Sequence, residues 1–165
     1  MKQLFMSCIA VFAMVSCSNA QEKFSDKALS EPLFTLNDRS TTLADILAKH
    51  KGKTIVIEVW ASWCSDCVKA MPQLKSLQTA HPEVDYVFIS MDKTTDKWKE
   101  GVEKHQLKGA HYMAPDGMKG KFGTAIDLDW IPRYIIIDKN GKIVTYRAIE
   151  KDFDAMDTTL NALKS

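Results

Sequence analysis

The tetrapeptide Cys64-Ser65-Asp66-Cys67 follows an apolar run, Thr54–Trp60, and opens a stretch with helical character. Two cysteines three residues apart at the start of a helix lie on one face, close enough to form a disulfide with little rearrangement. Free N–H groups and the helix dipole stabilise an anion at this position, so a cysteine pKa of about 8.5 can fall to roughly 3.5–7.5. The motif therefore indicates redox chemistry.

The two cysteines are expected to differ in reactivity. Cys64, in the first turn, is the expected nucleophile near neutral pH. Cys67, one turn further in, is expected to be more buried and closer to an ordinary thiol, which suits it to resolve a mixed disulfide. Half of a zinc site and a structural disulfide are the alternatives. Zinc needs four ligands, and neither a second Cys pair nor a closely spaced His pair occurs among His50, His81, His105 and His111, so no metal is predicted.

Length and charge restrict the class of protein. The 165 residues suit one compact domain. The chain has 22 basic and 21 acidic residues, and Lys2 is the only charged residue among the first twenty, so the remainder has 21 of each. A near-neutral surface argues against nucleic-acid binding.

Residues 1–20 have the pattern of a secretory signal peptide, with Lys2 before the apolar stretch Leu4–Val15. That stretch is too short for an ordinary membrane span. We therefore expect an extracytoplasmic, periplasmic protein, with residues 21–30 as a linker and residues 31–165 as the folded domain.

The end of the signal peptide can be read in two ways. Residues 18–20 (Ser-Asn-Ala) form a small-x-small cleavage site, whereas residues 14–17 (Met-Val-Ser-Cys) resemble a lipoprotein box with Met in place of the usual Leu. We favour lipidation of Cys17, which would end the signal at residue 16 and anchor the protein to a membrane. A cysteine where the apolar stretch ends is otherwise a poor choice in an oxidising compartment. Either reading leaves only the CxxC pair free for disulfide exchange, too few cysteines for a stabilising framework.

Strand and helix patterns alternate beyond residue 30, and a hairpin follows them. This order predicts an α/β fold with a central mixed β-sheet flanked by helices. Strands are expected at Leu33–Leu36, Thr54–Trp60, Val84–Met91, Tyr134–Asp138 and Ile143–Tyr146. Helices are expected at Leu43–His50 behind an N-cap at Thr42, Cys64–Ala80, Asp96–Gln106, Gly117–Thr124 and Phe153–Leu163.

Three segments carry a resemblance to a known family. Residues 60–67 (Trp-Ala-Ser-Trp-Cys-Ser-Asp-Cys), Pro72 and residues 131–134 (Ile-Pro-Arg-Tyr) closely resemble the thioredoxin superfamily. Together with the signal sequence, residues 135–143 (Ile-Ile-Ile-Asp-Lys-Asn-Gly-Lys-Ile) resemble the extracytoplasmic thiol-disulfide oxidoreductases of the TlpA and ResA type. The resemblance runs from about Ser30 to the C-terminus. It implies a thioredoxin-like fold and reduction of protein disulfides without a cofactor, with electrons supplied by a membrane donor.

The resemblance also assigns roles to single residues. It makes Cys64 the attacking cysteine and Cys67 the resolving one. Pro132 matches the family's cis-proline, and Ile131 before it would offer backbone hydrogen bonds to an extended substrate. Trp63 is expected to cover the edge of the disulfide. A trans Pro132 at the start of an edge strand is the alternative for this loop.

Glu58 is an ionisable residue within an otherwise apolar strand. It lies six residues before Cys64, where the thioredoxin pattern has a buried Asp that helps to move a proton from the resolving cysteine. Burial would raise the pKa of Glu58 and make it a proton acceptor. The alternative is a side chain that points to solvent, since Glu is rarely fully buried.

Two residues depart from the family pattern. Asp66 stands where Pro usually precedes the second cysteine, and its charge would oppose a Cys64 thiolate. We therefore predict a reducing rather than a strongly oxidising potential, unless solvent screens Asp66. Trp130 stands where the family often has Gly, and either forms an apolar wall for substrate beside Ile131 or is a surface aromatic without a partner.

Two functions of other classes remain open on the sequence. A thiol peroxidase would use one activated cysteine, but the PxxxTxxC arrangement of peroxiredoxins is absent around Cys64. A non-catalytic thioredoxin-like binding module would use the same surface without needing its thiols.

Overall fold

A computed structural model describes residues 21–164. The expected signal peptide and Cys17 lie outside the described residues. One seven-stranded sheet has the strand order β2-β1-β5-β4-β3-β6-β7. The inner strands β3, β4 and β5 are mutually parallel, and the remaining pairings are antiparallel. The strands are β1 (Pro32–Thr35), β2 (Ser40–Thr42), β3 (Ile55–Trp60), β4 (Asp85–Ser90), β5 (Ala110–Met113), β6 (Arg133–Ile137) and β7 (Ile143–Ala148).

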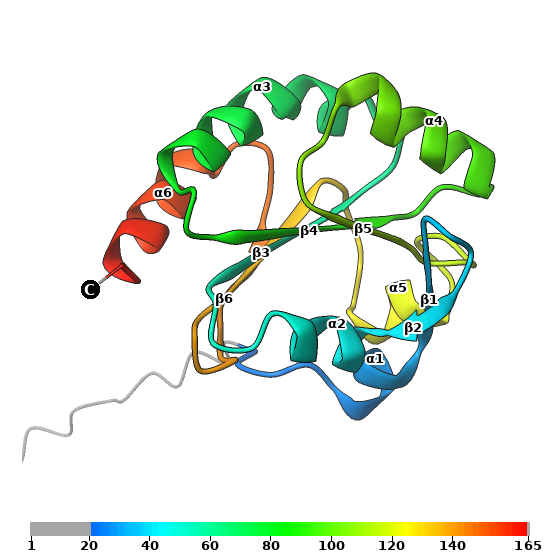
Figure 1. The fold of residues 1–165 in the computed structure, drawn as a ribbon, viewed down its shortest axis with the longest axis horizontal. Helices are drawn as coiled ribbons and strands as arrows, with labels where there is room; N and C mark the ends of the chain where they lie inside the picture. Colours follow the sequence, from blue (N-terminus) through cyan, green and yellow to red (C-terminus); the bar gives the residue numbers. More distant parts are fainter. Residues whose placement is uncertain (1–20, 165) are drawn as a thin grey trace, which may run out of the picture.

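Helices cover both faces of this sheet (Figure 1). On one face lie α3, α4 and α6, and on the other lie α1, α2 and α5. The helices are α1 (Asp26–Ser30), α2 (Leu43–Lys49), α3 (Ser65–Ala80), α4 (Thr95–His105), α5 (Lys121–Ala125) and α6 (Phe153–Ala162). The α/β prediction is thereby confirmed.

The central strands form the core. Every residue of β3 and of β6 is buried, as continuous apolar runs between two helix layers require. Trp60 is fully buried at the end of β3. Because α3 starts five residues later, the core holds the start of this helix at the carboxyl end of a rigid strand.

The N-terminal part of the described chain differs from the expected linker. Residues 26–30 form α1, in which the Ser25 hydroxyl accepts a hydrogen bond from the Ala28 N–H at 3.1 Å. Ala28 is fully buried, and Phe24 also belongs to the core. The segment packs against the domain because these two apolar side chains are buried in its core. Its mostly polar composition led to the prediction of a linker.

The sequence patterns did not predict two further strands, β2 and β5. Strand β2 has three residues, and β5 has four, which is too short for a clear alternation of apolar and polar residues. Strand β5 pairs in parallel with β4 and antiparallel with β1. These pairings supply its stability, and they depend on residues distant in sequence.

Candidate active site

The CxxC motif lies where β3 leads into α3. Cys64 is the N-cap of α3, and its sulfur accepts a hydrogen bond from the Cys67 N–H at 3.1 Å. The two residues form a disulfide, with their Cα atoms 5.3 Å apart. Cys64 keeps 6% of its surface exposed, whereas Cys67 has none. The predicted difference in burial is therefore confirmed, and the less buried cysteine is the one at the positive end of the helix dipole.

The loop before β6 faces this disulfide. The Ile131–Pro132 peptide bond is cis, and the Ile131 carbonyl oxygen lies 3.6 Å from the Cys64 sulfur. Residues 67 positions apart thus meet at one end of the sheet. Trp63 directly precedes Cys64, and Trp130 directly precedes Ile131. The two tryptophans are 58% and 51% exposed. The structure brings the predicted loop and cysteines together and places one exposed indole on each segment.

Glu58 is buried inside the sheet, with only 1% of its surface exposed. Its position opposite Tyr134 of β6 lets the tyrosine hydroxyl donate a hydrogen bond to Oε1 at 3.2 Å. Oε2 has no hydrogen-bond partner among residues 21–164. Burial raises the pKa of Glu58 from 4.5 to about 8, against the smaller lowering effect of the Tyr134 hydroxyl. The solvent-facing alternative for Glu58 is wrong.

A second buried carboxylate, which the sequence interpretation missed, holds the loop before Cys64. Asp92 follows β4 and is fully buried. Its Oδ1 accepts from the Ser62 hydroxyl at 2.7 Å, and its Oδ2 accepts from the Ser62 N–H at 3.0 Å and from the Ser90 hydroxyl at 2.7 Å. Gly101 of α4 packs against the same loop, since a Cβ there would lie 2.7 Å from Ser62 Cβ. The only signal in the sequence was an Asp at the end of a buried strand.

Asp66 lies in the first turn of α3, where its side chain is 38% exposed. Its carboxylate is 3.7 Å from the Lys69 ammonium. Water and this cation both weaken its effect on Cys64. The geometry therefore favours a small contribution of Asp66 to the redox potential.

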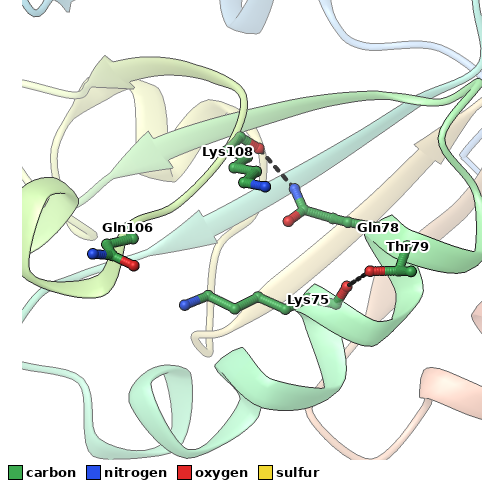
Figure 2. A pocket seen from close by; sticks show the side chains of 5 residues that line it. All are labelled: Lys75, Gln78, Thr79, Gln106 and Lys108. Carbon is green, nitrogen blue, oxygen red and sulfur yellow. Dashed lines mark hydrogen bonds between the residues drawn. The ribbon is translucent and has the colours of Figure 1, made fainter.

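A pocket of about 440 Å³ lies away from the cysteines, along α3 (Figure 2). The Gln78 side-chain amide closes one side by donating to the Lys108 carbonyl at 2.7 Å. The other lining residues are Lys75, Thr79 and Gln106. Neither Cys64 nor Cys67 is among the residues that line this pocket. Among residues 21–164, no cluster of three or more His, Cys, Asp or Glu side chains is arranged to hold a metal ion.

The geometry agrees with comparisons to known proteins. A thioredoxin-like family model matches residues 52–143, which is more than half of the chain. The chain belongs to the thioredoxin-like family. The matched range includes both cysteines, Glu58 and the cis-proline loop.

Relatives with established names include thiol-disulfide oxidoreductases. The chain is 27% identical over 144 residues to ResA of Bacillus thuringiensis, covering 86% of this chain and 81% of that protein. It is 25% identical over 101 residues to sporulation thiol-disulfide oxidoreductase A of Bacillus subtilis, covering 60% of this chain and 61% of that protein. The enzyme class of this thioredoxin-like protein is therefore thiol-disulfide oxidoreductase.

Solved structures show the same relationship. A protein from Bacteroides vulgatus, classed as a thiol-disulfide oxidoreductase, is 33% identical, with a TM-score of 0.66 and coverage of 83% of this chain and 88% of that one. A secreted disulfide oxidoreductase of Mycobacterium tuberculosis has a TM-score of 0.65 at 21% identity, over 84% of this chain and all of that one. The second likeness supports the thioredoxin-like fold alone.

Proposed function

We propose that this thioredoxin-like enzyme reduces disulfides in protein substrates outside the cytoplasm. The observation that carries the proposal is the Cys64–Cys67 disulfide at the N-terminus of α3, in contact with the Ile131 carbonyl. In this arrangement Cys64 keeps 6% of its surface exposed and Cys67 keeps none. A substrate disulfide can therefore reach Cys64 first.

The proposed reaction has two steps. The Cys64 thiolate attacks a substrate disulfide, which forms a Cys64–substrate bond and releases the first substrate thiolate. The Cys67 thiolate then attacks the Cys64 sulfur, releases the second substrate thiolate and forms the Cys64–Cys67 disulfide. The enzyme dithiol loses two electrons and the substrate disulfide gains two.

Glu58 is proposed to accept the proton of Cys67 in the second step. An ordinary cysteine has a pKa of about 8.5, so most of it is protonated at neutral pH. The raised pKa of Glu58, about 8, is close to that value, which suits proton transfer between the two groups. Oε2, which has no hydrogen-bond partner within residues 21–164, is the proposed acceptor atom.

The cis-proline loop and Trp63 are proposed to hold the substrate. The Ile131 carbonyl oxygen, directly before the cis-proline, lies 3.6 Å from the Cys64 sulfur, so this loop borders any segment bound to Cys64. Trp63, directly before Cys64, offers an exposed indole for apolar contact.

The cellular setting of the reaction is part of the proposal. The expected signal sequence supports an extracytoplasmic, periplasmic site, with Cys17 as a lipid anchor. Within residues 21–164, no helix is long and apolar enough to cross a membrane. A dithiol donor in the membrane would reduce the Cys64–Cys67 disulfide after each turnover. Labelling with a palmitate analogue in wild type and Cys17→Ala tests the anchor, and an unlabelled wild type contradicts it.

The experiment for the activity is capture of the mixed disulfide. We expect Cys67→Ala to retain insulin as a covalent adduct on Cys64, because the resolving thiol is absent. Mass spectrometry under non-reducing conditions would detect the adduct. The matched control is Cys64→Ala, which keeps Cys67 but should retain no adduct. Equal adducts on both variants would refute the assigned order of attack, and no insulin reduction by wild type would refute the activity.

A further inference from the structure

The loop between α5 and β6, residues 126–132, carries Trp130 two residues before the cis-proline. Its end is fixed by the contact of Ile131 with the Cys64 sulfur. Its start includes Asp127, which has a positive φ of 53°, an unusual conformation for a residue other than Gly. The conformation of this loop therefore decides where the Trp130 indole lies relative to a bound substrate.

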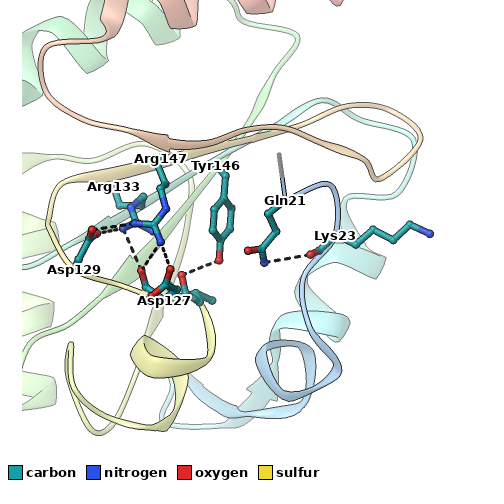
Figure 3. Close-up of polar contacts among 8 residues, drawn as sticks. Gln21, Lys23, Asp127, Asp129, Arg133, Tyr146 and Arg147 are labelled. Atoms are coloured by element: carbon teal, nitrogen blue, oxygen red, sulfur yellow. Dashed lines mark hydrogen bonds and ion pairs between the residues drawn. The ribbon is translucent and has the colours of Figure 1, made fainter. Parts of the chain in front are cut away.

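Arg147 of β7 binds two aspartates of the loop, Asp127 and Asp129 (Figure 3). Its guanidinium forms an ion pair with the Asp127 carboxylate and donates through Nη1 to Asp129 Oδ2 at 2.9 Å. It also donates through Nη2 to the Asp127 carbonyl at 3.3 Å. A planar guanidinium can bind several acceptors at once, whereas an ammonium is a single point charge. Arg147 thus fixes both the backbone and the side chains of the loop.

Arg133 supports the same loop from inside. It directly follows the cis-proline and is 1% exposed. Its guanidinium is paired with the Asp129 carboxylate and donates to the Asp127 carbonyl at 3.3 Å. The ring of Tyr146 lies 5.8 Å from the Arg133 guanidinium carbon and 5.9 Å from that of Arg147. The Tyr146 hydroxyl donates to the Ile126 carbonyl at 2.7 Å.

A hollow of about 330 Å³ lies beside the supported loop. Its apolar lining residues are Trp130 and Ile149, and its other lining residues are charged: Asp129, Arg133, Arg147, Glu150 and Lys151. Because Trp130 precedes Ile131, a substrate segment attached to Cys64 that extends along the cis-proline loop passes the indole and this hollow. Arg133 and Arg147 are both paired with Asp129. Trp130 is the large apolar side chain that the loop exposes.

We propose that Arg133 and Arg147 are positioning residues that hold Trp130 against an apolar side chain of extended protein substrates, and so make Trp130 a specificity determinant. This inference rests on the proposed disulfide reduction and adds the substrate class that the site prefers. A small disulfide does not extend to Trp130, whereas a protein disulfide flanked by an apolar residue does.

The test compares a protein disulfide with a small one. For Arg147→Ala, we expect KM for insulin to rise about fivefold with kcat little changed, since an ion pair and a positioned indole each contribute a modest free energy. The ratio of the insulin rate to the rate with oxidised glutathione should fall by a similar factor. Asp127→Asn, which removes the ion pair from the loop side and tolerates a positive φ, should reproduce the effect.

Lys142→Ala is the matched control. Lys142 is a cation of the same hairpin, paired at 2.8 Å with Glu22 rather than with the loop, and its removal should leave the rate ratio unchanged. Arg147→Lys should have an insulin KM between those of wild type and Arg147→Ala, because an ammonium cannot bridge both aspartates.

A double-mutant cycle decides whether Arg147 acts through Trp130. Once Trp130→Ala is in place, Arg147→Ala should raise the insulin KM no further. Fully additive effects, or an unchanged ratio in Arg147→Ala and Asp127→Asn, would overturn the inference. Failure of the disulfide reduction itself would be recognised earlier, because wild type would reduce neither insulin nor glutathione disulfide.

Discussion

Glu58 and Asp92 are both buried carboxylates near the carboxyl ends of neighbouring parallel strands, but their surroundings differ. Asp92 accepts three hydrogen bonds, which satisfy both of its oxygens. Glu58 accepts one, and its second oxygen has no partner within the described chain. The contrast separates two uses of a buried carboxyl group: Asp92 is suited to fix the loop before Cys64, and Glu58 is suited to take up and release a proton.

The largest expected effect that tests this contrast is on the stability of the oxidised protein. Glu58 has a pKa of about 8 in the folded chain, against 4.5 for the free side chain. Between these pH values the unfolded chain loses the proton first, so the free energy of unfolding falls as pH rises and levels off above pH 8. The loss reaches about 5 kcal/mol at most, from about 1.4 kcal/mol per pKa unit.

Glu58→Gln should remove that pH dependence. The variant is expected to approach wild type in stability near pH 4 and to be more stable by several kcal/mol at pH 9. Urea unfolding without reductant, which keeps the disulfide intact, measures the difference. Parallel stability curves for the two proteins would show that Glu58 does not titrate as described.

Asp92→Asn should have the opposite effect on stability. The substitution places an N–H donor where Ser62 and Ser90 need acceptors, so the free energy of unfolding should fall by about 2–3 kcal/mol. Urea unfolding at pH 7 measures it. Ser62→Ala, which removes one donor and keeps the carboxylate, is the milder companion, with a loss of about 1 kcal/mol. A neutral Asp92→Asn would mean that the network does not fix the loop.

Tyr134→Phe should have a smaller effect, on the pKa of Glu58. The ring, which packs 5.3 Å from Phe153, is kept, and only the hydroxyl that hydrogen-bonds the carboxylate is lost. Because that hydrogen bond lowers the pKa of Glu58, its loss should raise the pKa further. The pH midpoint of the resolving step, followed by stopped flow, should move upward. A midpoint that moves downward would contradict the role of the hydroxyl.

The smallest effect is expected at Asp66. Asp66→Asn removes a charge that opposes the Cys64 thiolate and so raises the redox potential, but exposure and Lys69 limit the change to less than about 20 mV. Equilibration with glutathione measures it, and Lys69→Ala should change the potential in the opposite direction. A much larger shift would return Asp66 to the importance that the sequence suggested.

The sequence predicted the strands and helices that have clear short-range patterns and the site residues that belong to the family motif. The apolar runs of β3, β4 and β6 and the capped helix α2 lie where expected, and the thioredoxin-like resemblance led to the cis bond before Pro132. Asp92, Tyr134 and the Arg133–Arg147 support of the loop were missed. Their partners lie on different strands and loops, so strand register and packing alone bring them together.

The most direct test of the central claim is the pH dependence of the resolving step. Thionitrobenzoate is first attached to Cys64, and its release by Cys67 is followed by absorbance from pH 6 to pH 10 in wild type and Glu58→Gln. We expect wild-type release to rise with a midpoint near pH 8 and the variant to be about 100-fold slower at pH 8, with attack by Cys64 little changed. Superimposable release profiles would contradict the assignment of Glu58 as the proton acceptor.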